Sequence, residues 1–96
     1  MSIRRWFRRL LSERRATSGR TPIYVGARLA LDVVEVQGVA RDVAPGGVFF
    51  ATTAPIARGV RGRLQQAGRP EWVPVRVTGH RAASATSPAG LGLAFE

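Results

Sequence analysis

The stretch RDVAPGGVFFAT, residues 41–52, shows most clearly how the chain folds. A Pro-Gly-Gly turn at 45–47 lies directly before an apolar run at 48–51. Proline presets φ at one position of a tight turn, and glycine permits a tight turn or a close approach of two backbones. We therefore expect one strand to end near residue 43 and the next to begin at residue 47. Asp42 then lies close to the turn, as a lone carboxylate in a strongly basic chain.

Apolar and polar side chains alternate on both sides of this stretch, from residue 23 onward, and this alternation predicts further strands. Pro74 cannot donate a hydrogen bond to a neighbouring strand, so we expect it at a sheet edge or a bulge. Short connections without helices between them indicate an antiparallel all-β fold. We favour a six-stranded barrel over a two-layer sandwich, because closure buries more surface and removes exposed edges. The six strands are expected at residues 23–31, 33–43, 47–53, 60–66, 71–81 and 91–96.

Residues 1–20 differ from the rest in composition, with seven arginines and a single glutamate. Their apolar residues recur at helical spacing, which predicts a short amphipathic helix with Trp6, Phe7 and Leu10 on its apolar face. The sequence leaves three partners open for this face: the chain's own domain, a partner protein or an anionic membrane surface. The small, polar segment at 16–22 predicts a flexible loop. We divide the chain into this N-terminal segment, 1–20, and a barrel domain, 21–96.

Composition limits the classes of function. The chain of 96 residues allows one domain, and the absence of cysteine excludes disulfides and thiolate metal sites. A net charge of +9 favours anionic partners such as a nucleotide, nucleic acid or membrane surface. One histidine, scattered carboxylates and no phosphate-binding loop form no catalytic or metal-binding pattern. We therefore expect a cytoplasmic binding module without enzymatic activity, cofactor or metal. Its apolar runs are too short for a secretory signal or a membrane-spanning helix.

Five motifs occur in a recognisable order along residues 13–96. They are the arginine-containing element ERRATSGRTP, the first-strand ending GARLAL, the turn segment DVAPGGVFFAT, the turn APIARG and the closing strand GLGLAFE. In order and spacing they resemble the PilZ domain family, whose members are receptors for the bacterial second messenger cyclic di-GMP. The resemblance implies a six-stranded antiparallel barrel, here preceded by the short N-terminal helix. It also implies a ligand held between the N-terminal loop and the turn segment on the barrel wall.

The resemblance implies ligand contacts at the positions that match the family's motifs. Arginine can pair with phosphate oxygens and with the O6/N7 edge of guanine. Asp42 would accept hydrogen bonds from guanine N1–H and N2–H₂, although from the residues alone it is a turn-forming residue at a strand end. Gly47 would allow the tight turn or a close backbone approach. The implied ligand residues are Arg14, Arg15, Arg20, Asp42, Ala44 and Gly47.

Two departures from the family pattern concern the ligand. Ala44 stands where the family has serine, which removes a ligand-contacting hydroxyl at a cost on the order of 1 kcal/mol, or about tenfold in affinity. Four residues separate Arg15 from Arg20, where the family has three. Arg14 occupies the position at which family members hold a stacked ligand dimer, so two ligands per chain are allowed. Ligand would draw this loop onto the barrel and reposition the adjacent helix to bind or release a protein partner.

Two other functions compete with this prediction. PilZ-like domains that lack ligand residues act through protein contacts, so the chain can instead be a degenerate adaptor that docks a partner through its N-terminal helix. A basic barrel can also bind nucleic acid, but single-strand binders need exposed aromatic side chains on one face. Here Phe49 and Phe50 should point to opposite faces, so we do not expect nucleic acid as a partner. Peripheral membrane contact through residues 1–20 stays open.

Overall fold

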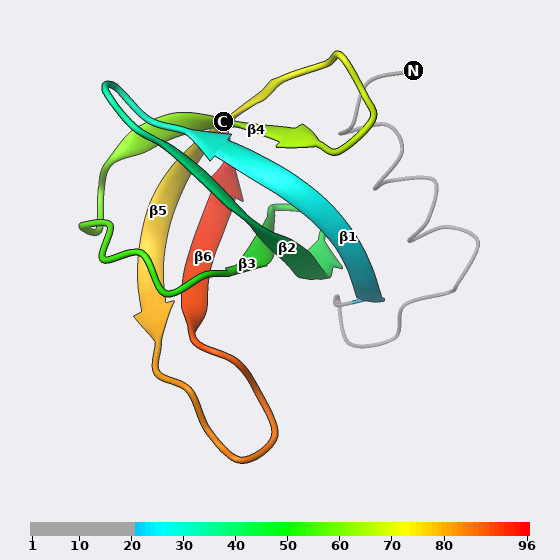
Figure 1. The fold of residues 1–96 in the computed structure, drawn as a ribbon, viewed down its shortest axis with the longest axis vertical. Coiled ribbons are helices and arrows are strands. Elements are labelled where there is room, and N and C mark those ends of the chain that lie inside the picture. Colours follow the sequence, from blue (N-terminus) through cyan, green and yellow to red (C-terminus); the bar gives the residue numbers. More distant parts are fainter. Residues whose placement is uncertain (1–20) are drawn as a thin grey trace.

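Six antiparallel strands close into a barrel in the computed structural model, which describes residues 21–96 (Figure 1). The order around the barrel is β1-β2-β3-β6-β5-β4, and β4 pairs with β1 to complete the closure. This confirms the predicted all-β antiparallel barrel. The helix predicted within residues 1–20 lies outside the described residues. The strands are β1 (Thr21–Ala30), β2 (Glu35–Ala44), β3 (Gly47–Ala51), β4 (Arg61–Gln66), β5 (Val73–Arg81) and β6 (Gly90–Phe95).

One face of each strand fills the barrel interior. Phe50, Leu29, Leu64 and Leu91 are the largest fully buried side chains. Successive side chains of a strand point to opposite sides, which is why the alternation in the sequence identifies the inner face. The inward positions expected on β1, β5 and β6 all belong to this core or pack against it: Ile23, Val25, Ala27, Leu29, Leu31, Val73, Val75, Val77, Leu91, Leu93 and Phe95.

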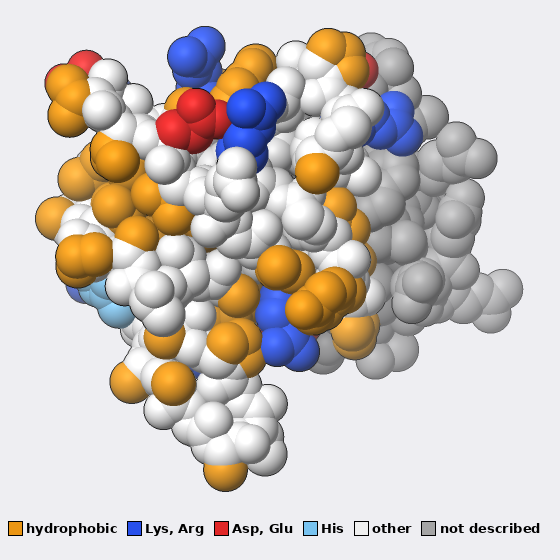
Figure 2. Space-filling view, viewed as in Figure 1, with side chains coloured by type: hydrophobic (Ala, Val, Ile, Leu, Met, Phe, Trp, Pro, Cys, Tyr) orange, Lys and Arg blue, Asp and Glu red, His pale blue; other side chains and the backbone are white. Residues whose placement is uncertain are grey.

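Strand ends differ from the prediction by one or two residues. β1 begins at Thr21, so the loop predicted at 16–22 extends two residues too far. β2 begins at Glu35 because the preceding residues form the hairpin tip, where Val33 is 94% exposed. Apolar atoms are visible at this tip, at the top left of Figure 2. Gln65 is a buried polar residue of β4, and the Arg28 guanidinium donates a hydrogen bond to its Oε1.

Pro74 lies at neither an edge nor a bulge, which corrects the prediction. It pairs with Arg63 of β4, and the pairing of β5 with β6 begins one residue later, at Val75↔Phe95. The nitrogen and carbonyl of a strand residue face the same neighbouring strand. The Pro74 carbonyl accepts from the backbone N–H of Glu96 at 3.0 Å, so its nitrogen also faces the C-terminal end of β6. The missing N–H therefore falls at the end of the β5–β6 ladder.

Three register shifts interrupt the ladders, and two of them lie on one wall of the barrel. On β2, Arg41 and Asp42 together lie opposite the single residue Phe49 of β3. On β5, Thr78 is an extra residue with no counterpart on β6. A bulge re-aims the neighbouring side chains and shifts the alternation of the strand beyond it. These two bulges therefore decide which side chains of β2 and β5 point outward on this wall.

Candidate ligand-binding groove

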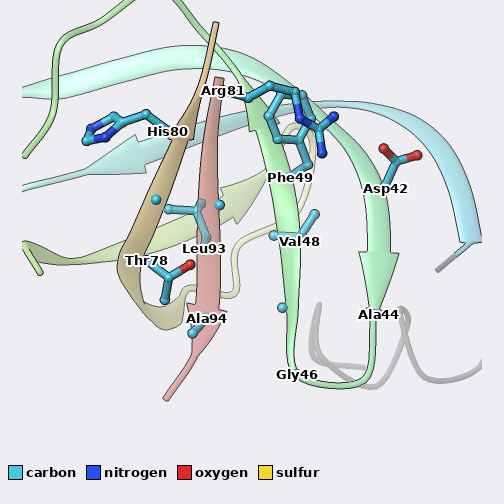
Figure 3. A pocket seen from close by; sticks show the side chains of 13 residues that line it. Asp42, Ala44, Gly46, Val48, Phe49, Thr78, His80, Arg81, Leu93 and Ala94 are labelled. Atoms are coloured by element: carbon cyan, nitrogen blue, oxygen red, sulfur yellow. The ribbon is translucent and has the colours of Figure 1, made fainter. Parts of the chain in front are cut away.

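A groove of about 380 Å³ lies on the wall formed by β2, β3, β6 and β5 (Figure 3). The β2–β3 hairpin forms one side, and the last part of β5 with β6 forms the other. Its volume falls within the usual range of small-molecule sites. Asp42, Ala44 and Gly47 all line it, so the barrel positions implied by the resemblance meet in one place. The other predicted contacts lie outside the described residues: Arg14, Arg15 and Arg20 for the ligand, and Trp6, Phe7 and Leu10 for a partner.

The DVAPGG turn is held against the last strand. Ala44 pairs with Gly47, so Pro45 and Gly46 alone form the loop of the β2–β3 hairpin. The Gly46 carbonyl accepts a hydrogen bond from the backbone N–H of Phe95 at 2.9 Å. The turn and the closing GLGLAFE strand are thus one structural unit, although about half the chain separates them in sequence.

Glycine at position 47 is required by the approach of β3 to β6. A Cβ built on Gly47 would overlap the carbonyl oxygen of Leu93 and lie 3.3 Å from the Cα of Ala94. These are backbone atoms, so no side-chain rotation can make room. Gly47, Gly92 and Ala94 line this part of the groove with backbone and small side chains. Such a surface lets a planar group approach the strands closely.

Asp42 brings a carboxylate to the groove through the β2 bulge. The side chain is partly exposed and lines the groove beside the hairpin. Within the described part of the chain it makes no hydrogen bond and no ion pair. Its neighbour in the bulge, Arg41, lies over the ring of Tyr24 at 5.7 Å. The Asp42 oxygens are therefore available to a ligand without the loss of an existing bond to residues 21–96.

Arg81 reaches the same groove from β5. Its guanidinium carbon lies 4.3 Å from the centroid of the Phe49 ring. Phe49 is on the outer face but only 6% exposed, and its ring occupies space that a Cβ at Gly90 would fill. Arg81 also donates a long hydrogen bond, 3.4 Å, to the Ser87 hydroxyl. Arg81 of β5 therefore brings a cationic group onto an aromatic ring of β3, in the groove that Asp42 of β2 also lines.

Sequence analysis did not single out Arg81, Phe49 or Thr78 as site residues. The inward run Val73, Val75, Val77 predicts that the next inward positions are 79 and 81. The extra residue Thr78 reverses this phase, so Arg81 points outward and His80 lies on the other side of β5 (Figure 3). His80 Nε2 is hydrogen-bonded to the Ile56 carbonyl, which gives the lone histidine a structural role. No signal in one sequence locates such a bulge.

Elsewhere on residues 21–96, two arginines, Arg28 and Arg61, form ion pairs. Arg28 forms an ion pair with Glu35 at 3.1 Å, and both Arg28 and Arg63 lie over the Trp72 ring, at 5.7 and 5.3 Å. On the face shown in Figure 2, arginines appear as separate small clusters rather than one continuous basic surface. A second groove of about 520 Å³ lies beside Arg28 and Arg69, but no carboxylate lines it. It therefore offers the N–H donors of guanine no charged acceptor, only the neutral amide oxygens of Gln37 and Gln65.

The described part of the chain, residues 21–96, gives no sign of a metal site or of a membrane-spanning helix. No group of three or more His, Cys, Asp or Glu side chains is placed to hold a metal ion in this part of the chain. The same residues contain no helix of the length and hydropathy needed to cross a membrane.

Of three comparisons with known proteins, the one with solved structures supports the fold. No protein-family model matches the chain, and no curated protein matches it in sequence. A solved structure, the Bacillus subtilis inhibitor of motility (MotI/DgrA), matches with a TM-score of 0.64 and 14% identity over 85% of this chain. The match covers 42% of that protein, so this chain spans less than half its length. At this identity the match establishes a shared fold, with a protein that is named as an inhibitor of motility.

Proposed function

We propose that the chain is a PilZ-type receptor domain for cyclic di-GMP, which acts on a partner protein through its N-terminal segment. The observation that carries this proposal is the Asp42 carboxylate, which lines a groove of ligand size and has no partner among residues 21–96. Two findings support it: the ordered motifs that resemble the PilZ family and the fold shared with a bacterial inhibitor of motility.

The chemistry of the groove suits a guanine base. Guanine offers two adjacent donors, N1–H and N2–H₂, and a carboxylate accepts both at once. Hydrogen bonds to a charged group contribute about 1.5–3 kcal/mol each, which makes Asp42 the strongest single contact that the barrel offers. The small residues around Gly47 and Gly92 let a flat base approach the strands. The phosphates would pair with Arg14, Arg15 and Arg20, as the resemblance implies.

This arrangement provides a mechanism for signalling. A ligand bound to Asp42 and to the arginines would bridge the barrel and the N-terminal loop, so binding would order residues 14–20 against the wall. The segment with Trp6, Phe7 and Leu10 would then be repositioned to bind or release a protein partner. Because cyclic di-GMP is a bacterial second messenger, we place this receptor in the cytoplasm.

The direct test is calorimetric titration of the whole chain with cyclic di-GMP at physiological salt. We expect selective binding that Asp42→Ala weakens by about 10- to 100-fold, because alanine removes the charged acceptor. Asp32→Ala is the matched control: it makes the same change at the exposed hairpin tip, away from the groove. An Arg15→Ala/Arg20→Ala variant tests the loop. Equal affinities of the Asp42 and Asp32 variants would contradict the proposed role of Asp42.

Ala44 favours a second candidate function, a degenerate domain that serves as a protein adaptor. Its methyl group lines the groove where the family has a serine hydroxyl. An adaptor of this kind would show no heat of binding with any cyclic dinucleotide. Its partner binding would survive Asp42→Ala and would be lost on Trp6→Ala or Leu10→Ala, whereas a receptor shows the opposite dependence on Asp42.

A further inference from the structure

We infer that Arg81 reads the base in this groove, donating to O6 and N7 of the guanine whose N1–H and N2–H₂ donate to Asp42. The inference rests on the proposed function and adds a residue that the family motifs do not include. It would make the barrel selective for guanine through two side chains of opposite character, from opposite sides of one groove.

The geometry supports a shared target for the two groups. Asp42 belongs to β2 and Arg81 to β5, with Phe49 of β3 between them in the barrel order. Figure 3 shows both charged groups directed toward the space beside the Phe49 ring. They do not form an ion pair with each other. An acceptor and a donor therefore line one open space without neutralising each other.

Arg81 is held in place before any ligand binds. Its guanidinium lies on the Phe49 ring, and Phe49 is itself fixed over Gly90. Stacking on an aromatic face restricts the long side chain while leaving its N–H groups free to donate. The hydrogen bond to Ser87 is long, 3.4 Å, and uses one nitrogen only. The remaining donors of the planar fork are available for two acceptors of a base.

Asp42 and Arg81 together complement the donors and acceptors of guanine, but not those of adenine. Guanine presents O6 and N7 as acceptors beside its N1–H and N2–H₂ donors, which matches a guanidinium beside a carboxylate. Adenine carries an amino group in place of O6 and has no hydrogen on N1. A donor would then face Arg81, and Asp42 would lose its partners. One correctly paired bidentate contact is worth about 1–3 kcal/mol of discrimination, or roughly 5- to 150-fold in affinity.

The test is a double-mutant cycle that combines one substitution in the protein with the removal of one atom from the ligand. Arg81→Lys keeps the charge and removes the fork, and Arg76→Lys on the exposed outer face of β5 is the matched control. Each chain is titrated with cyclic di-GMP, with its 7-deazaguanine analogue, which lacks N7, and with cyclic di-AMP. We expect Arg81→Lys to weaken cyclic di-GMP binding by about 5- to 150-fold and the control to change it less than twofold. The wild type should bind the analogue more weakly than it binds cyclic di-GMP. The Arg81→Lys variant should bind the analogue and cyclic di-GMP with equal affinity.

Each result decides the inference. Wild-type binding that Arg81→Lys leaves unchanged would overturn it and leave the proposed function standing. A loss of affinity by the same factor for all three ligands would also overturn the inference, because it would indicate that Arg81 has a phosphate-binding or structural role. A wild type that binds no cyclic di-GMP removes both proposals. Thermal unfolding verifies that each variant is folded, and Arg81→Gln replaces the lysine variant if that chain does not fold.

Discussion

Replacing Gly47 by alanine should destabilise the barrel, while the same change at Gly46 should not. A Cβ on Gly47 would come closer than 3.0 Å to the Leu93 carbonyl oxygen, an approach that real Cβ atoms essentially never make. It would also lie 3.2 Å from the Leu93 carbonyl carbon. Because these atoms belong to the paired backbone, β3 must move away from β6. The hydrogen bonds of that ladder would lengthen.

The size of the effect follows from this packing. One extra methyl group in a packed site costs about 1–3 kcal/mol, and we expect the upper half of this range because backbone must move. A domain of this size is stable by about 5–15 kcal/mol and loses roughly 4–8 °C of its unfolding midpoint per kcal/mol. Gly47→Ala should therefore lower the midpoint by about 10–20 °C.

Thermal and urea unfolding followed by circular dichroism measure this difference. Gly46→Ala is the control in the same turn, since nothing lies within 4 Å of its added Cβ and Gly46 does not adopt a positive φ. That variant should stay within about 0.5 kcal/mol of wild type or be slightly stabilised, because alanine restricts the unfolded chain. A midpoint for Gly47→Ala within about 2 °C of wild type, which corresponds to roughly 0.25–0.5 kcal/mol, would refute the close-approach argument.

Four further substitutions separate packing from binding. Phe50→Ala removes the largest fully buried side chain and should cost about 3–5 kcal/mol in urea unfolding. Ala44→Ser should raise the affinity for cyclic di-GMP about tenfold in calorimetry, with little change in stability, because position 44 lines the groove and not the core. His80→Ala should lower stability by about 1 kcal/mol, through the lost hydrogen bond to a loop carbonyl, as measured by urea unfolding. Arg61→Ala should change the unfolding free energy by less than about 0.5 kcal/mol, because its ion pair with Glu96 is largely exposed on the arginine side.

The barrel could be predicted because its core follows a simple period. Val73, Val75 and Val77 occupy alternate positions of β5, separated by Pro74 and Arg76, and each points inward as the pattern indicates. Strand ends were less accurate, since an apolar residue such as Val33 continues the pattern into a turn where it is 94% exposed. Alternation reports which face a residue occupies, but it does not show where the chain reverses direction.

The sequence by itself determined six strands, their inner faces, the Pro-Gly-Gly turn and the position of Asp42 near it. All of these depend on local period and turn chemistry, which neighbouring residues express directly. The tertiary structure alone decided the composition of the groove. Thr78 inserts one residue into β5, and this shift turns Arg81 outward onto Phe49 and His80 to the other side. Such a bulge depends on the register of β5 against its partner strand β6, so the pattern within one strand does not contain it.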